Sequence, residues 1–562
     1  MSRNHHIRVS LMATTIAVAV LVSNSLVAGQ QGGGGSARVP VISAPQVPSI
    51  ASPRVPSQGG SLPVQPAKNL ATQRLEALAQ AARMGVNYLP GEVIVKFKSG
   101  LGAAGQARAL SVMASPPTAD TIEWHSDFAV VRDASQPNAF ILADRLKSQP
   151  EVEYAEPNFL ITVDPLERGP WMPSPTTQPA PRRTSSAGTI TGVPNDTFYS
   201  GFQWNFSLIN MPQAWDLQPG GDPNLIVAVI DTGITVANAS LVYPIWTGSS
   251  FQTLTMPAAV NPDLPVVRLT TPKDYIGSRV SPPVPLADLD GHGTHVSSTI
   301  AEETNNSFLA SGMAYRVKIM PVKVCSQYWD LMISRGVAGT PGFDSRTEGT
   351  CSFADIADGV RYAVDNGARV LNISLGGDSP STTMQNALQY AASKGAFVAI
   401  AMGNDFLKGN PVQYPSAYAQ SIAGVMSVAA VGANSQHASY SSTGSYCEIA
   451  APGGDVDNSR QDLGRIWQST LRPSDLDPKT VTIPRFDSYP LVGYTGTSMA
   501  SPHVAALAAL LMSQNAKLTG AQVEQMIRSS ALDIGVAGKD DQFGHGLIQA
   551  RKALFGQTVH SK

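Results

Sequence analysis

Four polar side chains of this 562-residue chain stand where the local sequence would present them for chemistry: Asp231, His292, Asn404 and Ser498. Asp231 ends the apolar run LIVAVI, and Asn404 follows the run AFVAIAM and Gly403. His292 and Ser498 each follow a glycine-containing turn and precede a helix-like stretch. Acyl transfer requires a nucleophile, a base, a carboxylate that orients the base, and donors for an oxyanion. These four residue types can supply those roles.

The elements that must position these side chains alternate between strands and helices from Asn195 onward. Continuous runs of Val, Ile, Ala and Leu, separated by amphipathic helices, indicate a mainly parallel sheet covered on both faces. Sites on such sheets lie at the carboxyl ends of the strands. There the run ARVLNI ends at Ser374, Leu375, Gly376 and Gly377, which offer bare backbone.

The rest of the chain predicts a modular, exported precursor. Residues 1–28 carry arginines ahead of an apolar run and then small residues, which is typical of a secretory signal peptide. The apolar run is too short for a membrane span. Residues 29–66 and 165–194 are rich in Gly, Pro and Ser and predict unstructured linkers. Between them, residues 67–164 predict a small α+β domain, and residues 195–562 form the larger α/β domain.

Composition narrows the choice of partners. A hydrophobic content of 43% gives a large core, and a formal net charge of −2 without a dense Lys/Arg run argues against nucleic acid as a partner. No segment after the signal peptide reaches membrane-spanning length, so we expect a soluble, exported monomer.

Three cysteines allow at most one intramolecular disulfide. Cys325 and Cys351 bracket an irregular segment and are the predicted pair, although other pairings and three reduced, buried cysteines remain open.

Five segments, VAVIDTGI, DGHGTHVSSTIA, LNISLGG, AMGND and GTSMASPHVAALAAL, resemble the signature regions of the subtilisin-like serine proteases and occur in that family's order. The resemblance covers about residues 195–555 and implies the subtilisin-like three-layer α/β fold. It implies that Asp231 orients His292, that His292 is the general base, and that Ser498 is the nucleophile. It also implies that Asn404 stabilises the oxyanion together with the backbone N–H of Ser498.

The resemblance extends to the small domain, whose segments PGEVIVKFK and VEYAEPNFL are similar to the ferredoxin-like inhibitory propeptide of the same family. It implies a secreted zymogen, extracellular or periplasmic, that acts on proteins or peptides and is inhibited by its own propeptide. Cleavage is expected near residue 164 or within 167–194, where Arg182-Arg183 is one trimming point. Ser374, Leu375, Gly376, Gly377 and Gly403 are implied to bind substrate backbone.

The chemistry itself needs no cofactor. The family can hold structural calcium, but no ligands can be assigned here, so the metal content is unknown. At the expected specificity pocket, Gln413 stands where the family often has glycine. If its side chain points inward, the pocket is shallower and more polar, and Asp405 at the rim would favour a basic side chain.

Three other interpretations have less support. His292 and His295 lack the glutamate of a zinc-binding HExxH motif, so His295, like His503, is predicted to be a core histidine. The sequence Asp231-Thr232-Gly233 resembles half of an aspartic protease site, but the chain has no second DTG or DSG. A peptide-binding pseudoprotease is disfavoured because all four chemical positions hold the required residue types.

Overall fold

The computed structural model describes residues 77–78, 80–81, 84–114, 118, 121–163, 169–174, 192–246, 251–276, 286–326, 349–456, 461–472 and 484–560. The chain divides into two compact units, 1–64 and 65–562, and all described residues belong to the second. The predicted signal peptide and the first linker therefore lie outside the described residues, as does most of the helix expected before residue 84.

A seven-stranded sheet forms the centre of the larger domain, and every neighbouring pair in it is parallel. Apart from a half-buried, two-residue edge strand, its strands are almost entirely buried and rich in Val, Ile and Ala, whose side chains must be covered on both faces. In spatial order they are β16 (Ile449–Pro452), β15 (Val425–Val431), β14 (Phe397–Ala401), β13 (Val370–Ile373), β6 (Ile226–Asp231), β10 (Lys318–Lys323) and β9 (Lys273–Asp274).

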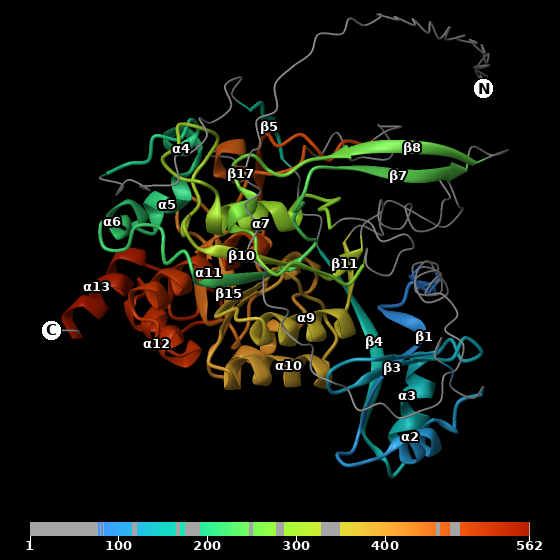
Figure 1. Ribbon diagram of the computed structural model, residues 1–562. Coiled ribbons are helices and arrows are strands. Elements are labelled where there is room, and N and C mark those ends of the chain that lie inside the picture. The colour runs from blue at the N-terminus through green and yellow to red at the C-terminus, as the bar shows by residue number, and fades with distance from the viewer. Residues whose placement is uncertain are drawn as a thin grey trace, which may run out of the picture. The chain divides into compact units, whose positions relative to one another are not determined.

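Helices cover the two faces of this sheet, as Figure 1 shows for α7 above and for α9 and α10 below strand β10. Alternate residues of β6 belong to different hydrophobic cores: Val227 and Val229 pack with α7 and α11, whereas Ala228 and Ile230 pack with α9 and α10. The predicted fold class is therefore confirmed. The helices are α4 (Tyr199–Phe202), α5 (Trp204–Leu208), α6 (Met211–Trp215), α7 (His292–Ala301), α9 (Phe353–Asp365), α10 (Thr382–Ser393), α11 (Thr497–Gln514), α12 (Gly520–Ser530) and α13 (Ala550–His560).

The small N-terminal domain has the strand order β4-β1-β3-β2 with antiparallel neighbours, which is the ferredoxin-like arrangement. Its elements are β1 (Tyr88–Phe97), α2 (Ala103–Leu110), β2 (Ile122–Trp124), β3 (Ala129–Arg132), α3 (Ala139–Lys147) and β4 (Val152–Thr162). The sheet does not end at β4. It continues into β12 (Thr350–Ser352) and β11 (Cys325–Ser326) of the larger domain, so one six-stranded sheet joins both domains.

A separate three-stranded sheet precedes the segment that carries Ser498. It contains β17 (Ile466–Ser469), β18 (Leu491–Tyr494) and the short β5 (Trp171–Met172). Strand β5 differs from the expectation of an unstructured segment over 165–194. Pro170 and Pro173 flank β5 and are compatible with an edge strand, where missing N–H groups leave no buried acceptor unpaired. A hairpin of β7 (Ala239–Trp246) and β8 (Phe251–Ala258) completes the strands.

Two further properties bear on the predictions. Cys325 and Cys351 form a disulfide between β11 and β12, and Cys447 is a buried free thiol. Within the described ranges, no helix combines the length and the apolar character needed to cross a bilayer.

Candidate active site

The carboxylate and imidazole expected to act together meet at the carboxyl end of β6. Asp231 is the last residue of β6 and is fully buried, and His292 is the first residue of α7. The Nδ1 atom of His292 lies 2.8 Å from Oδ1 of Asp231. Burial alone would lower the pKa of His292, but the charge and hydrogen bond of Asp231, with smaller effects of Asp290 and Asp288, raise it above its usual value. The imidazole is therefore a stronger base than a free histidine.

A buried aspartate, Asp288, joins the end of β6 to the start of α7. Its Oδ1 accepts hydrogen bonds from the Thr232 hydroxyl at 3.0 Å and from the backbone N–H of Asp290 and Gly291. Its Oδ2 accepts from the backbone N–H and the hydroxyl of Thr294. Thr232 follows Asp231, and Thr294 is in the first turn of α7, so Asp288 fixes the two elements that carry the carboxylate–imidazole pair. No motif or strand end in the sequence singled out Asp288.

Ser498 is the second residue of α11, and the helix follows Gly496, which has a φ of 152° that favours glycine. Its hydroxyl donates to the carbonyl oxygen of Ser374 at 3.1 Å. The Nε2 atom of His292 has no hydrogen-bond partner among the described residues. Ser498 thus lies at a helix start, with its hydroxyl hydrogen-bonded to the backbone at the end of β13.

The backbone carbonyl of Ser498 accepts a hydrogen bond from a residue outside helix α11. Pro502 has no N–H with which to close the usual hydrogen bond four residues earlier. The hydroxyl of Ser374 instead donates to the carbonyl oxygen of Ser498 at 2.9 Å. Ser374 and Ser498 are therefore joined by two hydrogen bonds of opposite direction.

The orientation of the Asn404 amide is set by Thr497. Oδ1 of Asn404 accepts from the backbone N–H of Thr497 at 2.9 Å and from its hydroxyl at 3.0 Å. Because a backbone N–H can only donate, the atom facing it must be the amide oxygen. The Nδ2 donors of Asn404 consequently remain for a group in the adjacent cavity, which is also lined by Ser498.

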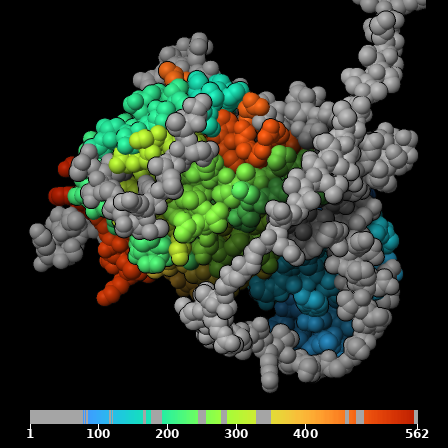
Figure 2. Space-filling model, turned by 45° about the horizontal axis from the view of Figure 1, so that its top comes forward, coloured from blue at the N-terminus to red at the C-terminus, as the bar shows by residue number. Residues whose placement is uncertain are grey.

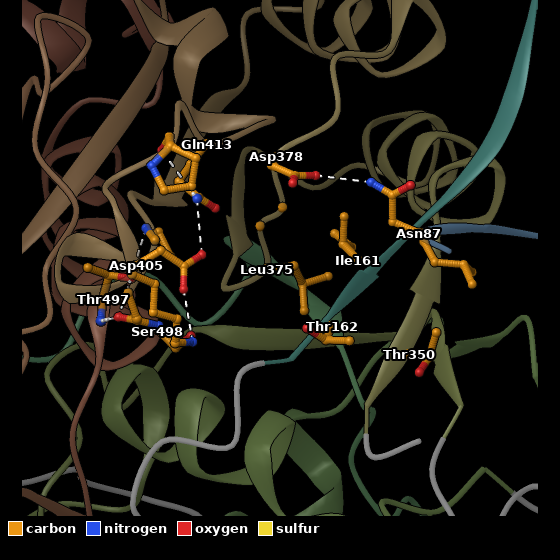
Figure 3. A pocket seen from close by; sticks show the side chains of 18 of the residues that line it. Asn87, Ile161, Thr162, Thr350, Leu375, Asp378, Asp405, Gln413, Thr497 and Ser498 are labelled. Carbon is orange, nitrogen blue, oxygen red and sulfur yellow. Dashed lines mark hydrogen bonds and ion pairs between the residues drawn. The ribbon is translucent and has the colours of Figure 1, made fainter. Parts of the chain in front are cut away.

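That cavity, of about 450 Å³, is the site where the remaining predicted residues meet (Figure 3). Its lining includes Ser374, Leu375, Gly376, Gly377 and Gly403 as well as Asn404 and Ser498. Strand β4 of the small domain also lines it through Leu160, Ile161 and Thr162, and Figure 3 shows Ile161 and Thr162 beside Leu375. The cleft therefore contains a segment of the same chain.

Strand β4 pairs antiparallel on both of its sides in this cleft. On one side Thr162 pairs with Gly376, and on the other side residues 160–162 pair with β12. A Cβ atom on Gly377 would lie 2.7 Å from Cγ2 of Ile161, so a glycine there makes room for this side chain. The chain segment that ends the small domain thus binds as an extended polypeptide would bind.

The small domain also caps two helices of the larger domain, which sequence reasoning missed. Glu156 accepts hydrogen bonds at the start of α10, from the Ser381 hydroxyl at 2.6 Å and from the backbone N–H groups of Thr382 and Thr383 at 2.8 and 3.0 Å. Asn158 accepts from the backbone N–H of Ala354 at the start of α9. A carboxylate at a helix N-terminus interacts favourably with the free N–H groups and the helix dipole. The polar residues of Glu156-Pro157-Asn158 were visible in the sequence, but the helices that they cap could be found only in the folded structure.

Gln413 does point toward the cavity, at its edge beside Gly403. A Cβ atom on Gly403 would lie 2.5 Å from Cγ of Gln413. The amide of Gln413 donates to Asp405 at 3.1 Å, and Lys408 forms an ion pair with the other carboxylate oxygen of Asp405 at 2.9 Å. Because Asp405 is already paired, its attraction for a basic substrate side chain is reduced.

The two other histidines near these motifs are part of the core. His295 stacks on Tyr494 with ring centroids 4.4 Å apart, and burial lowers its pKa to about 3. His503 lies 2.8 Å from Asn205, and burial lowers its pKa to about 4. Within the described part of the chain, no three His, Cys, Asp or Glu residues are arranged to hold a metal ion.

A parallel sheet covered on both faces, with a carboxylate–imidazole pair, a serine at a helix start and an oriented amide, is the arrangement expected of a serine hydrolase. The model of the subtilase family, Peptidase_S8, matches residues 222–546, and the model of the fervidolysin N-terminal prodomain matches residues 75–158. The chain belongs to the subtilase family. It is a serine-type endopeptidase with an N-terminal prodomain.

Curated relatives agree with this assignment. A thermophilic serine proteinase from Bacillus sp. strain AK1 is 31% identical over 83% of this chain and 88% of its own length. Thermitase from Thermoactinomyces vulgaris is 29% identical over 64% of this chain and 99% of its own length. Among solved structures, fervidolysin from Fervidobacterium pennivorans, described as a keratinolytic enzyme related to subtilisin, superposes with a TM-score of 0.54 at 20% identity. That superposition covers 84% of this chain and 61% of fervidolysin, and it supports the shared fold.

Proposed function

We propose that this protein is a secreted endopeptidase that hydrolyses peptide bonds in proteins through the triad Asp231, His292 and Ser498, and that it is made as a self-processing zymogen. The observation that carries the proposal is the 2.8 Å contact between Asp231 and His292. Ser498 and the oriented Asn404 amide, which line one cavity, support it. In the first step, Ser498 Oγ attacks the substrate carbonyl carbon and His292 Nε2 takes its proton. Asp231 holds the imidazole in the tautomer that leaves Nε2 free to accept.

Oxyanion stabilisation follows from the Asn404 amide. As the carbonyl carbon becomes tetrahedral, its oxygen gains charge and is stabilised by Asn404 Nδ2 and by the backbone N–H of Ser498, which lies in a first helical turn without an intrahelical acceptor. His292 then gives its proton to the leaving amine, and the C–N bond breaks. Water, deprotonated by the same imidazole, attacks the acyl-enzyme and releases Ser498.

The substrate is proposed to be an extended polypeptide. The pairing of β4 with Gly376 and with β12 supports this, because the same backbone groups can pair with any extended chain once β4 leaves. It also supports the prodomain as an intramolecular inhibitor. Secretion is supported by the N-terminal signal pattern and by the disulfide between Cys325 and Cys351, which forms in oxidising compartments. A monomer that needs no cofactor for its chemistry completes the proposal.

The Ser498→Ala variant tests the proposal. It should fold, keep the prodomain covalently attached and hydrolyse no casein, because the attacking atom is missing. A Ser513→Ala variant serves as a control, since it removes a hydroxyl from the other end of α11, where it donates to the Ala509 carbonyl and accepts from the backbone N–H of Asp222. Normal processing and caseinolysis by Ser498→Ala would refute the assignment of the nucleophile.

A further inference from the structure

The chain segment Gly169–Ser174, which follows the prodomain, is docked on the larger domain. Trp171 and Met172 pair antiparallel with Val492 and Leu491 of β18. Hydrogen bonds flank this pairing, since Gly169 N–H donates to the Gly493 carbonyl at 3.0 Å and Gly493 N–H donates to the Pro170 carbonyl at 3.3 Å. The segment therefore forms the third strand of the sheet that leads into Thr495–Ser498.

Side chains of the segment make contacts that a linker would not make. Met172 packs against a hydrophobic cluster of the larger domain that includes Trp467, Leu491 and Phe308. The ring of Trp171 lies under the guanidinium of Arg472, 4.8 Å from the ring centroid, and the Ser174 hydroxyl donates to the Tyr489 carbonyl at 2.8 Å. On the face shown in Figure 2, orange surface of the β17–β18 region adjoins cyan-green surface, the colour shared by Gly169–Ser174 and the residues from 192 onward.

The backbone approaches so closely that glycine is required at the first position of the segment. A Cβ atom on Gly169 would overlap the carbonyl oxygen of Gly493 and would lie 2.6 Å from Cδ of Arg465. The Gly493 carbonyl is part of the backbone, so it cannot move away as a flexible side chain could. This fit indicates a built contact between the two strands.

Two segments of the chain, the end of β4 and Gly169–Ser174, are docked on the larger domain. Strand β4 ends in the cavity that Ser498 lines, where the N–H of Val163 donates to the Gly349 carbonyl at 2.7 Å. Gly169 is bonded to Gly493, five residues before Ser498. Only six peptide links separate Val163 from Gly169, which reach roughly 20 Å when fully extended. The chain is thus held by the larger domain both at Val163 and again at Gly169.

We propose that the edge of β18 is a binding site for extended polypeptide, and that Gly169–Ser174 of this chain stays bound there after the prodomain has been removed. The mature enzyme would then begin upstream of Gly169 and keep β5 as its own N-terminal strand. This inference rests on the proposed self-processing only where it assumes that the prodomain is removed. The binding of Gly169–Ser174 to β18 does not depend on it. Residues 175–191 keep the segment covalently attached to the domain, so that its rebinding is intramolecular. The bound strand covers an edge that would otherwise present unpaired backbone groups.

The experiment combines intact-mass analysis with amide hydrogen exchange at Gly493, whose N–H is the donor to Pro170. In the wild-type protein, the mature species should contain residues 169–174, and the Gly493 amide should be protected both there and in the uncut Ser498→Ala chain. Gly169→Ala, made in both backgrounds, should speed exchange at Gly493 at least ten-fold. Gly201→Ala is the matched control because no atom lies within 4 Å of a Cβ at that position. Ser174→Ala, which removes a single side-chain hydrogen bond, should speed exchange about five-fold.

The outcomes separate this inference from the proposed function. A mature enzyme that begins after Ser174 and lacks the segment would overturn the retention of β5. Equal exchange at Gly493 in the Gly169→Ala and Gly201→Ala chains would overturn the binding site itself. If the wild-type chain never loses its prodomain, the proposed self-processing fails, and the binding site is then judged by the exchange of Gly493 in the uncut chain.

Discussion

Replacing Glu156 should weaken the binding of the prodomain to the catalytic domain. The Glu156 carboxylate accepts three hydrogen bonds at the N-terminus of α10, whose own first turn contains no acidic residue. Hydrogen bonds to a charged group are worth about 1.5–3 kcal/mol each. The Ser381 and Thr382 donors can partly return to water in the separated domains, so we expect a total of about 3 kcal/mol. This corresponds to a loss of affinity of roughly 150-fold.

The assay follows the activity that appears when the processed complex is diluted. Glu156→Ala should release active enzyme at a concentration roughly two orders of magnitude higher than the wild-type complex does. Glu156→Gln keeps one acceptor oxygen but loses the charge, and it should shift the release about ten-fold. Glu153→Ala is the control, because Glu153 lies on the same strand but pairs with Lys96 inside the prodomain. Equal release from the Glu156→Ala and Glu153→Ala complexes would refute the proposed capping of α10.

Three further results are expected. Asn404→Ala should lower kcat with little change in KM, by about 10²–10³-fold, the range known for such a donor in subtilisin; an unchanged kcat would remove Asn404 from the oxyanion site. Asp288→Asn removes a negative charge that helps raise the pKa of His292. Because only the neutral imidazole acts as a base, activity falls as pH drops through this pKa, so the acidic limb of the pH–rate profile should move to lower pH. An unmoved limb would limit Asp288 to a structural role. Gln413→Gly should raise kcat/KM for peptides with a bulky apolar residue before the scissile bond about ten-fold relative to those with alanine, and equal gains for both would place Gln413 outside the specificity pocket.

Much of the fold of the larger domain could be predicted, because the apolar runs of its sequence indicate both the strands and the type of sheet that they form. The runs around Val227 and Val398 are apolar on both faces, so they could only be interior strands of a covered sheet. The placement of Asp231 and Asn404 at strand ends followed from the sheet type alone. The roles of His292 and Ser498 depended instead on the resemblance to a family, since the two residues are about 200 positions apart.

Contacts between residues that are far apart in the chain could not be predicted from the sequence. Asp288 accepts four hydrogen bonds from residues two to six positions downstream, but its bond from Thr232, 56 positions upstream, exists only after β6 and α7 are assembled. Glu156 sits in a strand, where its alternation with neighbours indicates exposure but not a helix to cap. Residues 169–174 were hidden by the prolines around them, because a two-residue edge strand has no periodicity to detect and gains its stability from the surface it pairs with.

The paired hydrogen bonds between Ser374 and Ser498 imply competition at the resting nucleophile. The Ser374 carbonyl accepts the Ser498 hydroxyl, yet it also belongs to the edge segment along which an extended chain would pair. An incoming peptide N–H directed at that carbonyl would displace the hydroxyl and leave it free to turn toward His292. Small acylating reagents without an N–H would have to break this hydrogen bond unaided. We therefore expect the enzyme to react faster with peptides than with such reagents, because a peptide releases the Ser498 hydroxyl for attack. This preference would add to any that the shape of the cleft provides.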